Sequence, residues 1–153
     1  MNKRIVLFIA VIAAIQGALG PAVAGDLSAT PVAQTRNGIT YLSGGIGESE
    51  SIAMKEAARN YTLMLTFASQ PTGSYLADVE VSIKEKSGSP VLESVTGGPI
   101  LLVQLAPGQY RVSAVSNGET VDKTVDIGDE HPLSVTLYWP EQPGQSEPRE
   151  PGL

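Results

Sequence analysis

Histidine, the side chain with the widest use in catalysis and metal binding, occurs once in this chain of 153 residues, at position 131. Acidic residues lie close to it at Asp126, Asp129 and Glu130, so His131 could serve as a metal ligand or as a general base. Useful metal sites ordinarily combine several histidine or cysteine ligands, and the chain has no cysteine. We therefore interpret His131 as a loop residue with acidic neighbours, and expect neither a metal nor a cofactor.

The acidic stretch at residues 126–130 could bind a hard cation through carboxylate and backbone oxygens. Its spacing differs from the D-x-D-x-D-G pattern of an EF-hand loop, so solvated turn carboxylates are favoured and cation binding stays open.

The glycines at 44, 45 and 47 could cradle a phosphate, but no Lys-Ser/Thr pair follows them, which favours a hinge. No G-x-S-x-G elbow is present either. We predict that the protein is not an enzyme.

Three aromatic residues are candidates for contact with a ligand or partner. Tyr75 and Tyr138 are expected to escape the core, and an exposed ring could stack on a sugar or grip another protein. Trp139 shares the strand phase of Leu137, which favours a structural role as a cap of the core. Tyr75 and Tyr138 are therefore the predicted contact residues.

The N-terminus has the order of an export signal. A basic region at residues 2–4 precedes an apolar run at 5–15, and Ala22-Val23-Ala24 provides an A-x-A cleavage site. The alternative, a membrane anchor, would need about 20 apolar residues, more than this run offers. We expect a signal peptide at residues 1–24, no membrane anchor in the mature form, and a location in the periplasm or outside the cell.

The charge balance disfavours polyanionic partners. The net charge is −6, and loss of Lys3 and Arg4 from 10 basic residues leaves 8 against 16 acidic residues, or −8. No basic patch is visible, so nucleic acid and anionic membrane surfaces are not expected as partners.

The rest of the chain reads as one short helix followed by strands. Residues 25–46 look like a flexible leader, in which 39–42 could form a short strand, and acidic then basic residues favour a helix over about 48–59. Four prolines and two glycines after Trp139 predict a disordered tail at 140–153. Alternating apolar residues between turn signals predict seven strands, over residues 61–68, 77–84, 91–95, 100–105, 110–116, 120–127 and 133–139.

A Pro-Gly turn at Pro107-Gly108 joins two of these strands. We expect Gly108 to adopt a positive φ and Tyr110, which starts the next strand, to bury its ring and to hydrogen-bond through its hydroxyl. Pro107, Gly108 and Tyr110 are thus predicted to be structural, as is Trp139.

The pattern L-x-P-G-x-Y-x-V at this turn resembles the carboxypeptidase regulatory-like, or transthyretin-like, β-sandwich domain. L-A-D-V-E-V-S-I from Leu76 is similar to the opening strand of that family, and G-G-P-I-L-L-V-Q-L from Gly97 is similar to its central hairpin. The helix and N-Y-T-L-M-L-T-F-A resemble an extension found in small exported bacterial members of unknown function. The resemblance implies a scaffold without a defined chemistry, and the histidine sets of catalytic relatives cannot be assembled here.

These observations predict a mainly β fold, a seven-stranded antiparallel Ig/prealbumin-like sandwich with one short N-terminal helix, over residues 47–139. The expected function is non-enzymatic binding or scaffolding through a sheet edge or face, with an envelope or extracellular protein as partner. The alternatives are a carbohydrate-binding module that uses Tyr138 and its neighbours, and a hydrolase whose site is not visible. A bare apolar edge strand would favour protein, and a cluster of Tyr75, Tyr138 and one more aromatic residue on a flat face would favour a glycan.

Overall fold

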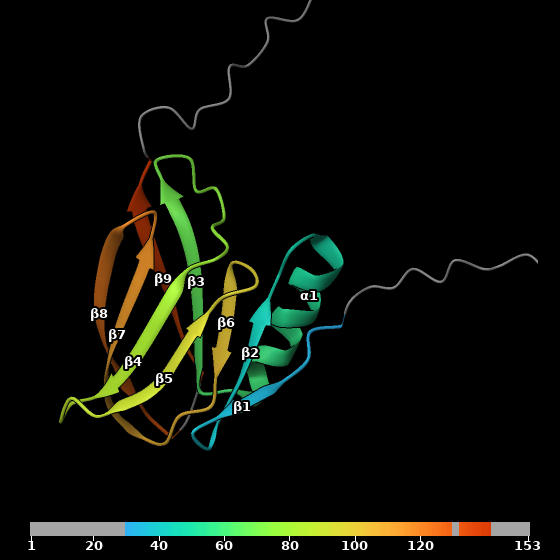
Figure 1. Cartoon of the computed structure of the whole chain (residues 1–153). Coiled ribbons are helices and arrows are strands. Elements are labelled where there is room, and N and C mark those ends of the chain that lie inside the picture. The colour runs from blue at the N-terminus through green and yellow to red at the C-terminus, as the bar shows by residue number, and fades with distance from the viewer. Residues whose placement is uncertain (1–29, 130–131, 142–153) are drawn as a thin grey trace, which may run out of the picture.

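The structure is mainly β, with two sheets and one short helix (Figure 1). It is a computed structural model that describes residues 30–129 and 132–141. The helix α1 spans Glu48–Ala57 and continues as a 3-10 turn over Ala58–Asn60. The strands are β1 (Gln34–Arg36), β2 (Ile39–Gly44), β3 (Leu63–Gln70), β4 (Glu80–Glu85), β5 (Pro90–Val95), β6 (Ile100–Val103), β7 (Gly108–Ser116), β8 (Glu119–Ile127) and β9 (Leu133–Pro140).

The strands form a five-stranded sheet in the order β1-β2-β6-β3-β9 and a four-stranded sheet in the order β5-β4-β7-β8. All pairs are antiparallel except β3 with β9, which run parallel, so the prediction of a wholly antiparallel fold is wrong for this pair. The chain crosses from the four-stranded sheet to the other after β8, instead of turning back in a hairpin, and this lets β9 run beside β3 in the same direction.

The two sheets pack face to face over a common core. Every second residue of the strands points inward, and the one fully apolar strand, β6, lies between β2 and β3, buried on both sides. The core side chains from the five-stranded sheet include Tyr41, Leu63, Leu65, Phe67, Leu101, Val103, Leu137 and Trp139, and those from the four-stranded sheet include Val81, Ile83, Leu92, Tyr110, Val112, Ala114, Val125 and Ile127.

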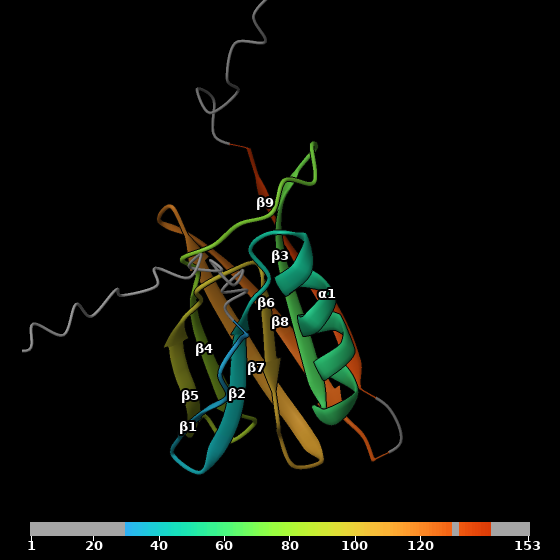
Figure 2. The same cartoon turned by 90° about the vertical axis from the view of Figure 1, so that its right-hand side faces the viewer.

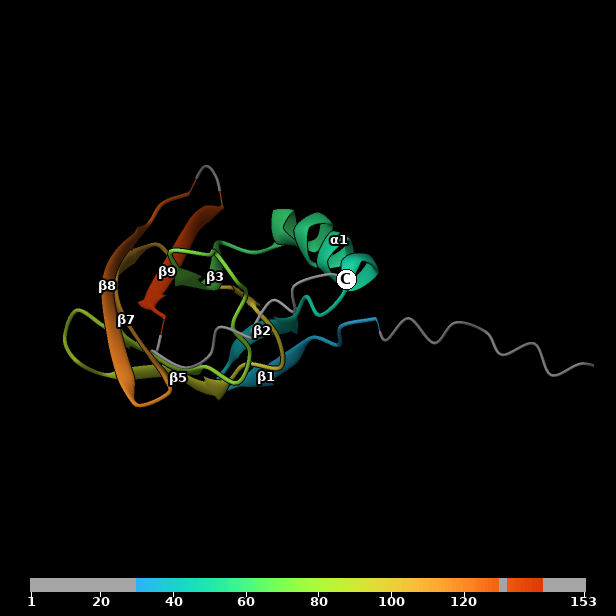
Figure 3. The same cartoon turned by 90° about the horizontal axis from the view of Figure 1, so that it is seen from above.

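Helix α1 covers part of the outer face of the five-stranded sheet (Figures 2 and 3). The strand register places Leu42, Leu102 and Met64 in one outward row, and Met54 of the helix is fully buried against it. The helix thus covers β2 and β6 but leaves much of the outward face of β3 and β9 open. No helix in the described part of the chain is long and apolar enough to cross a membrane.

The N-terminal part of the fold differs from the sequence-based expectation. Residues 34–44 form the β1–β2 hairpin, which completes the five-stranded sheet. The short strand suggested at 39–42 lies within β2, whereas β1 replaces part of the predicted flexible leader. The described chain thus has nine strands, and the seven other predicted ones correspond to β3–β9. Asn37 and Gly38 have φ angles of 52° and 78°, which allows the tight turn between β1 and β2. Three sequence-based predictions concern residues outside the described ranges: the signal peptide at 1–24, the loop residue His131 and residues 142–153 of the tail. The first residue of the predicted tail, Pro140, is described and ends β9.

Candidate functional site

The two tyrosines predicted to contact a partner lie in one row of the five-stranded sheet, on either side of Ala68. Tyr75 forms an isolated antiparallel bridge with Ala68, and Tyr138 of β9 is the parallel partner of the same residue. Leu76 and Trp139, the next residues along the chain, pack against the core, so both tyrosines face outward. Tyr75 is 63% exposed and Tyr138 46%, whereas Ala68 between them is 3% exposed. The row therefore presents two accessible rings over a small buried residue.

Backbone and side-chain hydrogen bonds hold the segment that carries Tyr75. The N–H of Ser69 donates to the carbonyl of Ser74 at 2.8 Å, and the N–H of Leu76 donates to the carbonyl of Phe67 at 3.0 Å. The hydroxyl of Thr72 lies 3.2 Å from that of Ser69 and 2.9 Å from that of Ser74. These bonds attach both sides of Tyr75 to β3, which positions its ring relative to Tyr138.

Strand β9 also has a free backbone edge. The N–H of Leu133 donates to Thr62 at 2.9 Å and the N–H of Glu141 donates to Gln70 at 2.8 Å, so odd-numbered residues direct their backbone groups to β3. In a parallel ladder the intervening residues direct theirs to the other side, where no strand pairs with β9 within residues 30–129 and 132–141. The residues whose backbone groups face this free edge are Ser134, Thr136 and Tyr138.

The four edge strands differ in their protection. Strand β1 has three residues, and its Arg36 donates to the carbonyl of Glu93 on β5 at 2.6 Å, which closes that side of the fold. Strand β5 starts with Pro90 and has a register shift against β4. Strand β8 carries four charged residues, whereas β9, L-S-V-T-L-Y-W-P, has none over eight residues. Charges, proline and bulges are the usual devices that stop an edge from pairing, so β9 has the least protected edge.

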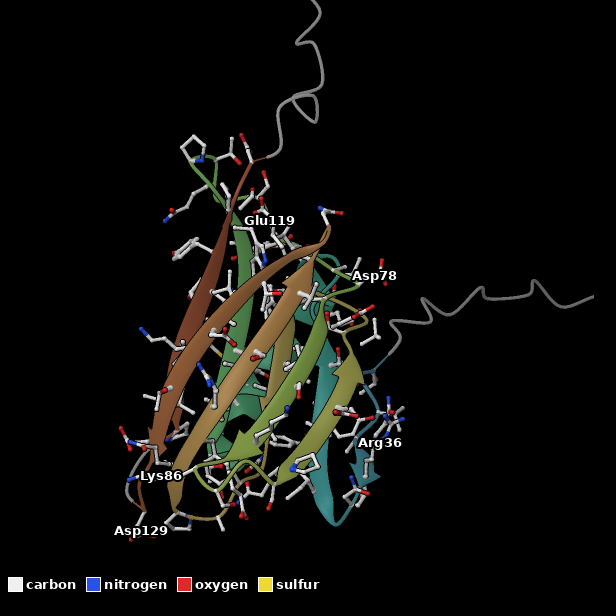
Figure 4. All side chains as sticks on the ribbon, turned by 60° about the vertical axis from the view of Figure 1, so that its left-hand side comes forward. Arg36, Asp78, Lys86, Glu119 and Asp129 are labelled. Carbon is white, nitrogen blue, oxygen red and sulfur yellow. The ribbon has the colours of Figure 1, made fainter. Side chains whose placement is uncertain are left out.

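The outer face of the four-stranded sheet carries a shallow hollow of about 580 Å³ over β4, β7 and β8. A second hollow, of about 620 Å³, reaches from β4 and β5 across to Arg36 and Tyr41 of the β1–β2 hairpin. Lys84, Lys86 and Arg111 line the first, together with Glu85 and Asp122. Figure 4 shows Lys86 at one end of this face and Glu119 at the other. Both signs of charge are mixed along the hollow, so this face shows no preference for an anion or a cation.

The Pro-Gly turn has the geometry expected of a structural element. Gly108 has a φ of 152°, and Tyr110 is 7% exposed, with its hydroxyl donating to the carbonyl of Ala106 at 2.8 Å. Burial raises the pKa of Tyr110, and the carboxylate of Glu85 raises it further. Pro107 is exposed at the turn. The turn therefore anchors the start of β7 through the buried hydroxyl of Tyr110.

Trp139 closes the side of the fold where β8 and β9 meet. Its ring is 3% exposed and lies 6.1 Å from the ring of Phe67, between centroids, at an interplanar angle of 54°. Its indole N–H donates to the carbonyl of Glu119, the first residue of β8, at 3.0 Å. Trp139 thus links the two sheets while the next residue back, Tyr138, points outward.

The glycine-rich stretch before α1 holds a carboxylate of the chain itself. The N–H of Gly45 donates to a carboxylate oxygen of Glu50 at 3.0 Å, and Glu48 and Glu50 both lie in the first turn of the helix. Two carboxylates at this position disfavour a phosphate on electrostatic grounds. The stretch leads from β2 into α1, and its role as a hinge stays a prediction.

The acidic turn is described only in part. Asp126 accepts a hydrogen bond from the side-chain amide of Gln109 at 3.0 Å, and Asp126 and Asp129 are exposed. No group of three or more histidine, cysteine or acidic side chains within the described ranges could hold a metal ion. Glu130 and His131 lie outside those ranges, so the sequence-based interpretation of His131 stays a prediction.

Sequence reasoning did not identify Ala68 or the free edge of β9 as parts of a site. Ala68 lies in a predicted strand among other small or apolar residues. Only its pairing with Tyr75 on one side and Tyr138 on the other shows that it lies between the two exposed rings. The uncharged, alternating pattern of residues 133–139 is visible in the sequence. The sequence does not show that this strand lies at the edge of a sheet, because that depends on the strand order.

Comparison with known proteins yields one family. A family model described as the Rhizobiales growth-associated tandem repeat domain matches residues 62–138, which contain β3 to nearly the end of β9 and therefore both sheets without β1, β2 and α1. No curated protein matches the chain. On the extent of this match, the chain belongs to the family of the Rhizobiales growth-associated tandem repeat domain.

Proposed function

We propose that the protein is a non-enzymatic binding or scaffolding module that accepts a peptide strand of an envelope or extracellular protein along the free edge of β9. The observation that carries this proposal is the eight-residue edge of β9, which has no charge and no proline before its last residue. An edge of this kind is the template for β-augmentation, in which an incoming strand extends a sheet.

The free edge offers a donor and an acceptor at each of Ser134, Thr136 and Tyr138. An incoming strand that pairs with these groups would form up to about six hydrogen bonds, each contributing roughly 0.5–1.5 kcal/mol net. The side chains of the same residues stand on the outward face and would contact alternate side chains of the partner. Affinity would thus come from the backbone, and selectivity from the outward side chains beside it.

The family supports a modular role. Its description as a tandem repeat domain refers to units that occur in series. We propose in addition that the fold is related to the Ig/prealbumin-like sandwich of the carboxypeptidase regulatory-like family. The two face-to-face sheets support this relation, as does the hydroxyl of Tyr110, which bonds to the backbone upstream in the manner of a tyrosine corner.

We place the protein in the periplasm or outside the cell, after removal of residues 1–24. The basic, apolar and A-x-A segments support this location, and intact-mass analysis of the exported protein tests it. A mature chain that begins at Gly25 is expected. A mass that retains Met1 to Ala24 would contradict the proposed export signal.

The binding role is tested by affinity capture from the native envelope with matched edge variants. Thr136→Pro removes one N–H from the free edge of β9 without removing a bond to β3, and Thr136→Lys adds a charge there instead. Thr124→Pro makes the same change on the free edge of β8. We expect a protein that the wild type and Thr124→Pro retain and that both Thr136 variants lose. Equal capture by all four proteins would refute the proposal.

A further inference from the structure

We propose that Tyr75 and Tyr138 form a second binding site, separate from the edge of β9, for a linear chain of neutral β-1,4-linked pyranose sugars. The two rings stand on the outward face of the five-stranded sheet, whereas the free backbone groups of β9 lie in the plane of that sheet. A ligand on the rings and a strand on the edge would therefore use different groups of the protein, except for the side chain of Tyr138, which borders both.

The spacing of the rings is set by the sheet. Tyr75, Ala68 and Tyr138 occupy three adjacent strand positions in one row, so the Cα atoms of the two tyrosines lie about 10 Å apart. Ala68 has only a methyl group, which keeps the floor between the rings low. Two rings at this separation can each receive one sugar of a flat, extended oligosaccharide.

The surroundings of the rings suit a neutral ligand rather than an anionic one, because the carboxylate of Glu141, which accepts a hydrogen bond from Thr72, lines the same hollow as Tyr75. Thr66 and Thr136 form the next row of the sheet on one side, and Gln70 and Pro140 form the row on the other. None of these four residues is charged, and their hydroxyl and amide groups can exchange hydrogen bonds with sugar hydroxyls. Aromatic stacking with a few placed polar groups is the usual composition of such a site.

The site is also held in place before any ligand binds. The hydrogen bonds of Ser69, Ser74 and Leu76 fix the segment around Tyr75, and the ladder with β3 fixes Tyr138. Neither tyrosine hydroxyl has a hydrogen-bond partner in the described part of the chain, so both are available. A site that needs no rearrangement loses less affinity to ordering.

The test is calorimetric titration of the whole mature protein with cellotetraose and with tetra-N-acetylchitotetraose. We expect at least one of them to bind with a dissociation constant below about 1 mM. Tyr75→Ala and Tyr138→Ala should each weaken binding about tenfold or more, and Tyr138→Phe, which keeps the ring, should change it less than about threefold. Ile52→Ala, at an exposed apolar residue of α1, is the matched control and should have no effect.

Two further measurements separate this site from the edge of β9. Ser134→Pro, which removes a backbone donor from the free edge of β9 at a residue outside the sugar site, should retain the tetrasaccharide, and thermal unfolding of every variant shows whether it is folded. Failure of both tetrasaccharides to bind the wild type would refute the inference. So would tyrosine variants that bind sugar normally but lose a captured protein, since the rings would then be anchors for that protein. The first result would leave strand pairing by β9 untouched and the second would agree with it, and Thr136→Pro tests that pairing separately by capture.

Discussion

Strands β8 and β9 are neighbouring edges that differ in chemistry rather than in geometry. They meet where the indole of Trp139 donates to the carbonyl of Glu119, and each has one side without a paired strand among the described residues. The two-residue turn pairs Ser116 with Glu119, so Glu119 and every second residue after it direct their backbone groups to β7. The residues between them, from Thr120 to Asp126, direct their backbone groups to the free edge of β8. Both edges thus present the same kind of hydrogen-bonding groups.

The difference lies in the side chains beside those groups. Glu119, Asp122, Lys123 and Asp126 place charges along β8, which an incoming strand would have to accommodate or desolvate. Strand β9 has only serine, threonine, tyrosine and its terminal proline on its outward face. Unpaired backbone groups alone therefore do not define a docking edge, because the charges beside them decide whether pairing with an incoming strand is favourable.

The largest predicted effect concerns the contact between the two edges. Trp139→Ala should destabilise the protein by about 3–5 kcal/mol, because it removes a large buried ring and the hydrogen bond to Glu119. Chemical denaturation measures this change. Trp139→Phe keeps most of the packing against Phe67 and should cost clearly less. Equal stability of wild type and Trp139→Ala would show that Trp139 does not hold β8 and β9 together.

A smaller effect is expected at the opposite end of β8, where Tyr110 of β7 pairs with Val125. Tyr110→Phe should cost roughly 0.5–1.5 kcal/mol at neutral pH, because the carbonyl of Ala106 loses its donor. The loss is measured by denaturant unfolding. A Tyr110→Phe variant as stable as the wild type would mean that this bond adds nothing to the anchoring of the β7–β8 hairpin.

The same residue predicts a pH dependence. Burial, and then Glu85, raise the pKa of Tyr110 above its ordinary value of 10.0, so the folded state holds the phenolic proton more tightly than the unfolded state. The associated stability is complete below pH 10 and is lost as the pH rises through the folded pKa. Denaturation between neutral and strongly alkaline pH should show this decline, and Tyr110→Phe should reduce it. Burial raises the pKa of Tyr61 as well, so part of the decline should remain.

The β7–β8 and β1–β2 hairpins each have a glycine with a positive φ in the turn. Gly118, at the start of β8, has a φ of 80° and Gly38, at the start of β2, has a φ of 78°. Substitution of either by alanine should be unfavourable by up to about 1 kcal/mol, because alanine resists positive φ. Gly118→Ala should have the larger effect on global unfolding, since β7 and β8 pair over nine residues and β1 with β2 over three. Equal unfolding midpoints for the two variants would contradict this ranking.

The smallest effect is expected where β9 ends. Removal of residues after Glu141 should change the free energy of unfolding by less than about 0.5 kcal/mol. Removal after Trp139 should cost more, because Glu141 accepts a hydrogen bond from Thr72 and donates its N–H to Gln70. Thermal unfolding of the two truncated chains checks this order. Identical midpoints would mean that these contacts of Glu141 do not stabilise the end of β9.

The strand pattern was predictable from the sequence wherever alternation and turn residues agreed. Asn117-Gly118 predicts a hairpin turn because clear alternating runs flank it. Asn37-Gly38 has the same residue types, but the three-residue strand before it is exposed throughout and shows no alternation. The sequence therefore predicts a flexible leader with a short strand at 39–42, and not the β1–β2 hairpin that the chain forms.

The candidate site was predictable only as a set of residues. The phase of Tyr138 opposite to Trp139 indicated an exposed ring, and Tyr75 was placed outside the strands. Their shared partner Ala68 depends on a parallel pairing between segments that are distant in the sequence, and local periodicity contains no information on strand order. For the same reason the open edge of β9 could not be distinguished from that of β8.

The most direct test of the central claim is a photo-crosslinking scan along both edges in living cells. A photoreactive amino acid is placed in turn at positions 134, 136 and 138 of β9 and at positions 120, 122 and 124 of β8, and adducts are separated by mass. Strand pairing predicts adducts to one partner from the β9 positions and few from β8, and a Thr136→Lys substitution should abolish those at 134 and 138. Adducts from β8 with none from β9 would contradict the proposal that a partner strand pairs with the free edge of β9.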